Sequence, residues 1–176
     1  MASSEFGSQS SGRFVHPIGY NRRVKIGSIS FKGFQPANEA ASRMGRGNSA
    51  RNTKPELLLR RALWKRGIRY RLHDRSLAGT PDIVLPRERI AIFCDGDFWH
   101  GRSWAKRRKK LRDGANSSYW LAKIGGNIRR DRRVNRVLRR FNWNAIRVWE
   151  SSIRRDPDGV AERIVSRIRR MRNGRR

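Results

Sequence analysis

Two short apolar segments separated by one tight turn constrain this chain more than any other feature. The segments are PDIVLP at residues 81–86 and RIAIFCD at residues 89–95. Short apolar runs bounded by turn residues are typical of buried strands, and a turn this short joins antiparallel neighbours. We therefore predict a hairpin of residues 82–86 and 88–95 about Pro86-Arg87. Its open end would bring Asp82 to the backbone of Cys94 and Asp95.

Apolar periodicity and turn residues predict the elements around this hairpin. Thr53 and Glu56 form a capping box at the start of a helix that Gly67 ends. The other predicted elements are a strand over 68–74, a polar loop with a basic run over 102–116, a helix over 117–142 interrupted or kinked at Gly125-Gly126, a strand over 143–150 and a final helix over 160–172. This order predicts an α/β fold with a mixed β-sheet flanked by helices, the core arrangement of the restriction-endonuclease-like fold.

The first 50 residues differ in composition from the rest of the chain. They carry nine Ser and seven Gly, so we predict a flexible, mildly basic arm over 1–50 and one folded domain over 51–176. The opening MASSEFGSQSSG resembles a cloning remnant or a flexible tail and has no secretory signal pattern. Within the arm, SISFKGFQ is predicted as a short strand.

The charge balance predicts an anionic partner. Lys and Arg number 43 against 14 Asp and Glu, which gives a formal net charge of +29. A polyphosphate relieves such self-repulsion by releasing counterions, so nucleic acid is the predicted partner. A membrane surface is the alternative, disfavoured because basic residues run through the whole folded part. No apolar run approaches the roughly 20 residues of a membrane span, and Cys94 is the only cysteine, so we expect a cytosolic protein.

The few acidic residues include candidates for phosphodiester hydrolysis. That reaction needs a hard divalent cation, an activated water and a stabilised leaving oxygen, and Mg2+ prefers carboxylate ligands. Asp82 and Asp95 stand at the open end of the hairpin, and His100 follows on the loop that leaves it. His100 would then be a general base or acid. The structural alternatives are a turn aspartate at Asp82 and a solvated histidine at His100.

Other residues have both a structural and a functional interpretation. Glu56 is explained by the capping box, and Asp131 by pairing with its arginine neighbours. Trp143 and Trp149 are predicted core residues.

Three aromatic residues near this loop, Phe98, Trp99 and Trp120, fit a wedge between base steps or a cap on the core edge. The basic run Lys106, Arg107, Arg108, Lys109 and Lys110 fits phosphate contact or a solvated loop, and the overall charge favours phosphate contact.

From about Ser42 to Ile153 the chain resembles the very short patch repair (Vsr) endonucleases. The resemblance rests on SRM, RNTKPELLLRRAL, LAGTPDIV, IAIFCDGDFWHG, YWLAKIGGNIRRDRR and VWE, in this order. It implies the restriction-endonuclease-like fold, dependence on Mg2+, and nicking of DNA 5′ to the thymine of a T·G mismatch. It also implies that Asp82 is the central metal ligand, that the backbone carbonyl of Cys94 completes the site, and that Asp95 assists.

The resemblance gives the remaining candidates their roles. It implies that His100 is the general base, that Asp131 supports it, and that Glu56 lies near the active site. Phe98, Trp99 and Trp120 match the aromatics that intercalate beside the mismatch.

The chain departs from the family at its structural zinc site. The family has cysteines where Asp97 and Ser151 stand here, and commonly another at Trp104. A thiolate zinc site is therefore not available, and we expect no zinc.

The first hypothesis is a Mg2+-dependent endonuclease that acts as a monomer on double-stranded DNA, in the cytoplasm with the nucleoid. A second hypothesis is a Vsr-like homing or restriction-type enzyme that cuts a matched site. A third is a non-catalytic nucleic-acid-binding module, against which Asp82, His100 and Asp131 argue.

Overall fold

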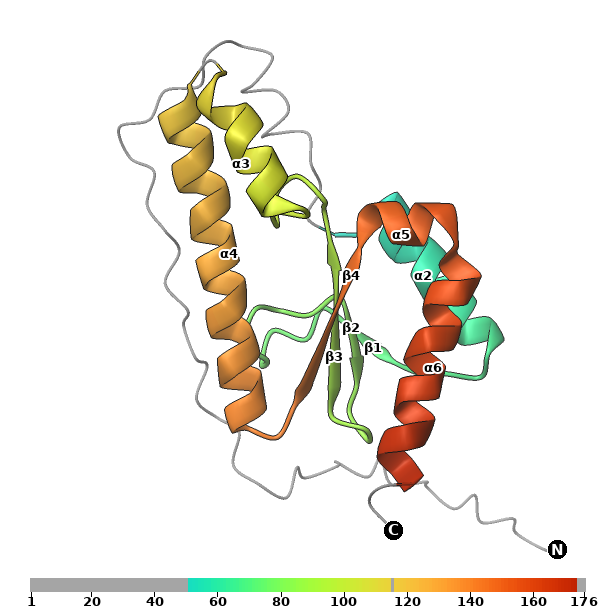
Figure 1. Ribbon diagram of the computed structural model, residues 1–176. Coiled ribbons are helices and arrows are strands. Elements are labelled where there is room, and N and C mark those ends of the chain that lie inside the picture. Colours follow the sequence, from blue (N-terminus) through green and yellow to red (C-terminus); the bar gives the residue numbers. More distant parts are fainter. Residues whose placement is uncertain (1–50, 115, 174–176) are drawn as a thin grey trace, which may run out of the picture.

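The computed structural model describes residues 51–114 and 116–173. Its centre is a mixed four-stranded sheet in the order β1-β2-β3-β4, with helices on both faces (Figure 1). The elements are α2 (Lys54–Lys65), β1 (Arg71–Leu72), β2 (Ile83–Leu85), β3 (Ile90–Asp95), α3 (Trp104–Arg112), α4 (Ser117–Arg140), β4 (Asn144–Trp149), α5 (Glu150–Arg155) and α6 (Pro157–Asn173). The predicted fold class, a mixed sheet flanked by helices, is confirmed. The predicted arm over 1–50 and its strand SISFKGFQ lie outside the described residues.

The predicted hairpin is confirmed. β2 and β3 pair antiparallel with Ile83 opposite Ile92, and the connecting turn ends at Arg89, whose φ is +53°. β4 then pairs parallel with β3, so that Asp95 lies opposite Trp149. Such a parallel pair needs a long crossover, and α3 and α4 supply it. The ends of β3 and β4 therefore meet at one edge of the sheet.

Two hydrophobic clusters cover the two faces of the sheet. Ile90 and Ile92 of β3 pack with α2, α5 and α6, whereas Ala91 and Phe93 pack with α4. Because successive side chains of a strand point to opposite faces, a strand with this all-apolar sequence is buried on both sides. The alternation also decides where the residues at the end of β3 point.

The predicted loop over 102–116 is wrong over residues 104–112, which form α3. The segment is mostly Lys and Arg and has no continuous apolar stripe. Trp104, Arg107 and Leu111 are nevertheless half-buried at helical spacing, and α3 packs against α4 (Figure 1). Tertiary packing therefore stabilises a helix that its apolar pattern does not predict.

The predicted interruption at Gly125-Gly126 is also wrong, since α4 is continuous from Ser117 to Arg140. Gly126 is buried, and residues of α4 on both sides of the pair are buried as well. This packing offsets the roughly 1 kcal/mol per glycine that helix formation costs.

The C-terminal segment differs from its prediction in three details. Glu150 ends no strand but begins α5, and α6 begins at Pro157. Trp143 is buried as expected, whereas Trp149 is only half-buried.

None of the helices in the described part of the chain combines the length and the apolar character that crossing a bilayer requires.

Candidate active site

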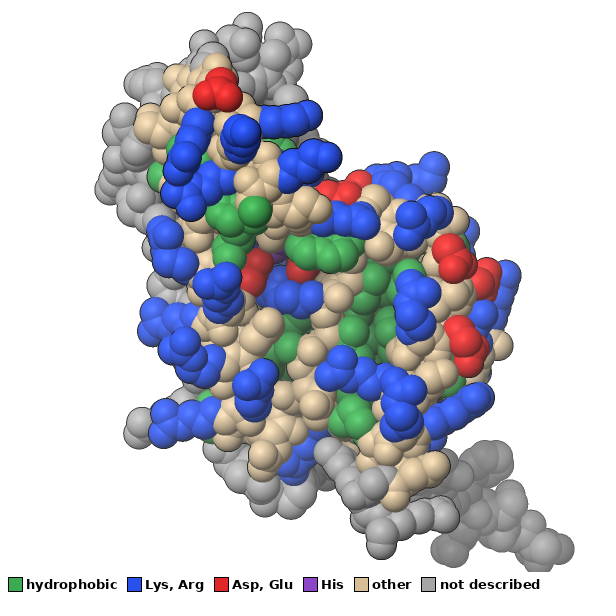
Figure 2. Space-filling model, viewed as in Figure 1, with side chains coloured by type: hydrophobic (Ala, Val, Ile, Leu, Met, Phe, Trp, Pro, Cys, Tyr) green, Lys and Arg blue, Asp and Glu red, His purple; other side chains and the backbone are tan. Residues whose placement is uncertain are grey.

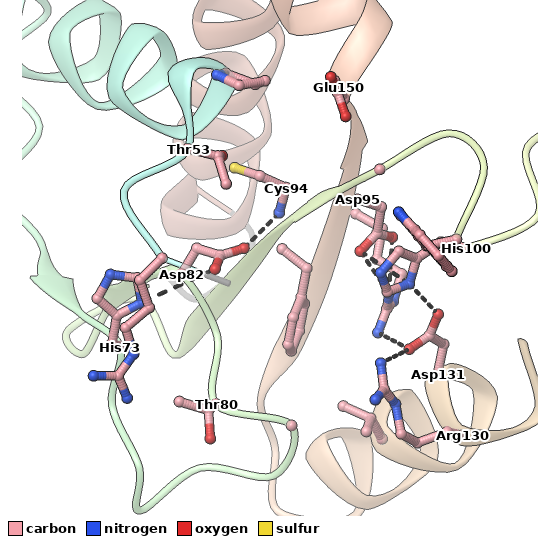
Figure 3. Close-up of a pocket in the computed structure, with 18 of the residues that line it drawn as sticks. Thr53, His73, Thr80, Asp82, Cys94, Asp95, His100, Arg130, Asp131 and Glu150 are labelled. Carbon is pink, nitrogen blue, oxygen red and sulfur yellow. Dashed lines mark hydrogen bonds and ion pairs between the residues drawn. The ribbon is translucent and has the colours of Figure 1, made fainter. Parts of the chain in front are cut away.

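A pocket of about 740 Å³ opens where β2 begins and β3 ends. Asp82, Cys94, Asp95, His100 and Asp131 all line it, together with residues from α2, α4 and β4. Figure 3 shows two groups of ionisable side chains, one on each side of β3. The structure therefore gathers into one pocket residues from segments that lie far apart in the sequence, from Arg51 to Arg154.

The first group contains Glu56, His73 and Asp82, with one ligand atom of each within 4.8 Å of the others. The capping box of α2 is confirmed, and it places the Glu56 carboxylate under the start of the helix. Glu56 is 1% exposed and forms an ion pair with Arg60, and its Oε1 lies 3.2 Å from Nε2 of His73. Asp82 accepts a hydrogen bond of 2.7 Å from the backbone N–H of Cys94. The hairpin therefore places Asp82, just before β2, in contact with Cys94 near the end of β3.

The Asp82 carboxyl has an unusual protonation equilibrium. Burial raises its pKa to about 6, the negative charges of Glu56 and Asp95 add to the rise, and the N–H of Cys94 opposes it. The positive charge of Arg60 also opposes the rise, but it does not outweigh the burial, so the carboxylate is only partly compensated. Burial likewise raises the pKa of the Cys94 thiol well above its usual value, so the thiol stays neutral.

The second group contains Asp95, His100 and Asp131. Nδ1 of His100 lies 2.6 Å from Oδ2 of Asp131 and 3.6 Å from Oδ1 of Asp95. Arg147 of β4 donates to both oxygens of Asp95 at 2.7 and 2.8 Å and lies 3.0 Å from Asp131. Burial alone would raise the pKa of Asp131, but the hydrogen bond and charge of His100 and the charge of Arg147 lower it. This group is charge-compensated without any added ion.

The alternation along β3 explains why the two groups are separate. Cys94 follows Ile90 and Ile92 and packs on the α2 side, whereas Asp95 follows Phe93 on the α4 side. Asp95 therefore meets His100 and Asp131 rather than the Glu56 group.

Aromatic side chains form a cluster beside the second group. The ring centroid of Phe98 lies 5.1 Å from the ring centroid of Trp99 and 5.3 Å from that of Trp120. Trp99 and Tyr119 also pack against Trp120. Figure 2 shows hydrophobic and acidic side chains in one hollow that is bordered by many Lys and Arg side chains. In the basic run of α3, Lys106, Arg108, Lys109 and Lys110 are exposed, whereas Arg107 is half-buried with its guanidinium 5.4 Å from the Phe98 ring.

Sequence reasoning missed His73 and Arg147. His73 is one of three histidines in the chain, and that rarity was a usable signal. Arg147 interrupts the apolar alternation of a strand, which is also a usable signal because a charge there needs a partner. The chain has 43 basic residues, however, so the residue type alone does not single out Arg147.

The pocket offers ligands of the kind that a hard divalent cation prefers, and the residues at the expected zinc positions do not line it. Asp82, whose hydrogen bond comes from a neutral N–H, offers oxygen donors of the kind that Mg2+ prefers. The positions at which the resemblance implies zinc-binding cysteines carry Asp97, Trp104 and Ser151, none of which supplies a thiolate. Instead, the Asp97 carboxylate lies 3.4 Å from Arg102 and accepts a 3.5 Å hydrogen bond from the N–H of Ser151. These contacts join the loop after β3 to the start of α5.

Comparison with known proteins identifies relatives of this chain. The family model described as DNA mismatch endonuclease Vsr matches residues 34–106. A type II nicking enzyme of Haemophilus parainfluenzae is 44% identical over 108 residues, which cover 61% of this chain and 75% of the relative. A type II nicking enzyme of Neisseria meningitidis serogroup C is 37% identical over 69% of this chain and 81% of the relative. The DNA mismatch endonuclease Vsr of Escherichia coli K12 is 35% identical over 60% of this chain and 66% of the relative.

Proposed function

Since the chain belongs to the Vsr family of DNA endonucleases, we propose that it is a Mg2+-dependent enzyme that nicks duplex DNA 5′ to the thymine of a T·G mismatch. The observation that carries the proposal is the single pocket in which a partly compensated carboxylate faces a carboxylate-supported histidine across β3. The names of the relatives support nicking, and that of the Escherichia coli relative supports a mismatch as the target.

In this proposal, Asp82 and the backbone carbonyl of Cys94 hold the cation, and Glu56 supports that side of the pocket. Bound Mg2+ supplies positive charge to the scissile phosphate and to the leaving oxygen. Asp95 does not join the metal side, because Arg147 holds both of its oxygens.

His100 takes the proton from the attacking water. Its Nδ1 is hydrogen-bonded to Asp131, which leaves Nε2 as the nitrogen that accepts the proton. Asp131 fixes the orientation of the ring and stabilises the imidazolium that forms, and Arg147 in turn fixes Asp131. Asp95 holds the other side of Arg147 and completes this support.

The DNA lies over the pocket and along α3. Lys106, Arg108, Lys109 and Lys110 contact phosphates, and Arg107 orients the aromatic cluster. Phe98, Trp99 and Trp120 enter the base stack beside the mismatch. In this proposal the enzyme acts as a monomer on double-stranded DNA, in the compartment that holds the DNA, the cytoplasm.

The test compares purified protein on T·G, matched and single-stranded substrates, with Mg2+ and with EDTA. We expect nicking of the T·G duplex alone, and only with Mg2+. Asp82→Ala and His100→Ala should bind the duplex but not nick it. Cutting by Asp82→Ala would overturn the metal assignment. Cutting of a matched plasmid at a fixed sequence would favour the restriction-type alternative, which the nicking names of the relatives also keep in view.

A further inference from the structure

We propose that His73 is a ligand of the catalytic cation through Nδ1, beside Asp82, so that the site binds Mn2+ more tightly, relative to Mg2+, than an all-oxygen site does. This inference rests on the proposed function, because it places a cation at Asp82. His73 belongs to none of the elements that the sequence singled out for catalysis.

The backbone holds His73 in an uncommon conformation beside Asp82. Its φ is +47°, in the left-handed region that few residues other than glycine adopt, although histidine does so more readily than most. This conformation ends β1 after two residues, while the His73 N–H still bonds the Asp82 carbonyl at 3.3 Å. The chain therefore turns at the point where the imidazole enters the pocket, which is a typical place for backbone strain to serve a site.

The other side of the ring has the support that metal-binding histidines require. Nε2 lies 3.2 Å from Oε1 of the buried Glu56. A histidine that binds a metal through one nitrogen usually donates its other N–H to a carboxylate, which fixes the tautomer. Arg60 shares Oε1 of Glu56 and lies 2.8 Å from the same Nε2. Because a guanidinium only donates, Nε2 accepts from Arg60 in one tautomer of the ring and donates to Glu56 in the other. A cation on Nδ1 selects the second tautomer, in which Nε2 carries the proton and Glu56 accepts it.

The gap between His73 and Asp82 has the width of a shared ion. Nδ1 lies 4.0 Å from Oδ1 of Asp82, and Figure 3 shows the two groups facing each other. That separation is too long for a hydrogen bond. Two ligands on opposite sides of one ion, each about 2.0–2.2 Å from it, lie roughly 4.0–4.4 Å apart. The gap therefore matches one cation held between Nδ1 and Oδ1 on its opposite sides.

The second histidine of the pocket does not have this freedom. Nδ1 of His100 is bonded to Asp131, and Arg147 occupies the oxygens of both nearby aspartates. The atoms of Asp95, His100 and Asp131 cluster as closely as those of the first group, but a cation is already among them. His100 is therefore the matched control for His73.

An imidazole ligand has a measurable consequence. Imidazole suits the first-row transition metals from Fe2+ onward, whereas carboxylate, carbonyl and water oxygens suit both Mg2+ and Mn2+. Of these two ions, Mn2+ is the transition metal and accepts an imidazole nitrogen more readily than Mg2+ does. The His73→Gln variant should therefore lose affinity for Mn2+ by on the order of tenfold and change much less for Mg2+.

The test uses the full chain with Mn2+ and no DNA. Pulsed electron paramagnetic resonance detects coupling between Mn2+ and a directly bound ¹⁴N nucleus. We expect this coupling in the wild type and in His100→Gln, its loss in His73→Gln, and loss of bound Mn2+ in Asp82→Asn.

Two outcomes overturn the proposal. One is wild-type protein that binds Mn2+ without ¹⁴N coupling, a result that needs no variant to fold. The other is a folded His73→Gln that keeps the coupling. If the wild type still nicks T·G DNA in either case, the proposed function stands and only the role of His73 fails. Protein that neither binds the cation nor nicks contradicts both.

Discussion

The two sides of the pocket solve the same electrostatic problem in opposite ways. On the α4 side, Arg147 pairs with both Asp95 and Asp131, and His100 and Arg147 together lower the pKa of Asp131 below its usual range. On the α2 side, Asp82 receives one neutral N–H, and its pKa rises to about 6. Both groups lie at the same end of β3. The opposite pKa shifts of Asp82 and Asp131 therefore come from the side chains around each carboxylate rather than from the position of the group in the fold.

This difference indicates that a cation would bind on the α2 side of the pocket. The α4 side is complete without a cation, so its carboxylates can hold His100 in a fixed orientation while the ring exchanges protons. The α2 side stores an unfavourable negative charge, which a divalent cation would relieve. A site that is destabilised until its ligand arrives is typical of a functional centre.

The largest effect should come from removing the partly compensated carboxylate. Asp82→Asn keeps the shape of the side chain but removes the charge that holds the cation. We expect nicking to fall by on the order of 10⁴ or more, with DNA binding retained. Single-turnover cleavage of a T·G duplex measures this, and Asp158→Asn on exposed α6 should cut at the wild-type rate. Equal losses in the two variants would refute the distinction.

Removing the histidine on the α4 side should have a smaller effect of a different kind. A general base is worth roughly 10²–10⁴ in rate, so His100→Ala should lose that factor. Its cation affinity should not change, because the proposed cation site lies on the other side of β3. Calorimetric titration with Mg2+ measures the affinity. If the His100→Ala protein no longer binds Mg2+, the two sides of the pocket form one cation site, and the distinction between them is wrong.

Arg147 should contribute to stability more than to any single step. Its side chain is 18% exposed, and replacing it with Met removes the guanidinium that pairs with both Asp95 and Asp131, so that Asp95 loses the partner of both its oxygens. Such a loss costs about 3 kcal/mol in the free energy of unfolding. Arg130→Met is the matched control, since Arg130 lies 3.6 Å from the same Asp131 but is 44% exposed. Denaturant unfolding should show a change below about 0.5 kcal/mol for the control. Equal costs would mean that burial does not decide the effect.

Local patterns in the sequence predicted most of the α2 side of the pocket. The hairpin, the capping box and the contact between Asp82 and the end of β3 follow from apolar runs and turn residues. Asp131 could be paired with His100 only through the family resemblance, because 31 residues separate them.

The rest depends on tertiary contacts that leave little local trace. His73 reaches Glu56 because one residue adopts a positive φ after a two-residue strand. The position of Asp95 depends on the exact end of β3, where a shift of one residue would exchange the two faces. The helix α3 is stabilised by packing on α4 rather than by an apolar stripe.

The smallest effect, and the most direct test of the stored charge, is the pH dependence of stability. The pKa of Asp82 rises from 3.8 to about 6 on folding, so the folded state binds this proton more tightly than the unfolded state. Its contribution to the free energy of unfolding is therefore fully present below pH 4 and is lost as the pH rises through about 6. Relative to Asp82→Asn, the wild type should lose roughly 2 kcal/mol across this window, a value reduced for partial exposure.

Asp131→Asn provides the opposite case in the same measurement. The pKa of Asp131 is lowered, so its charge stabilises the folded state above the usual carboxyl range, and that stability is lost as the pH falls. At pH 7 we therefore expect Asp131→Asn to be less stable than the wild type and Asp82→Asn to be more stable. Saturating Mg2+ should then stabilise the wild type but not Asp82→Asn, because only the wild type binds the ion. Thermal unfolding at pH 4 and pH 7 measures all three proteins, and a shift of the same sign in both variants would show that the two sides of the pocket do not differ in charge compensation.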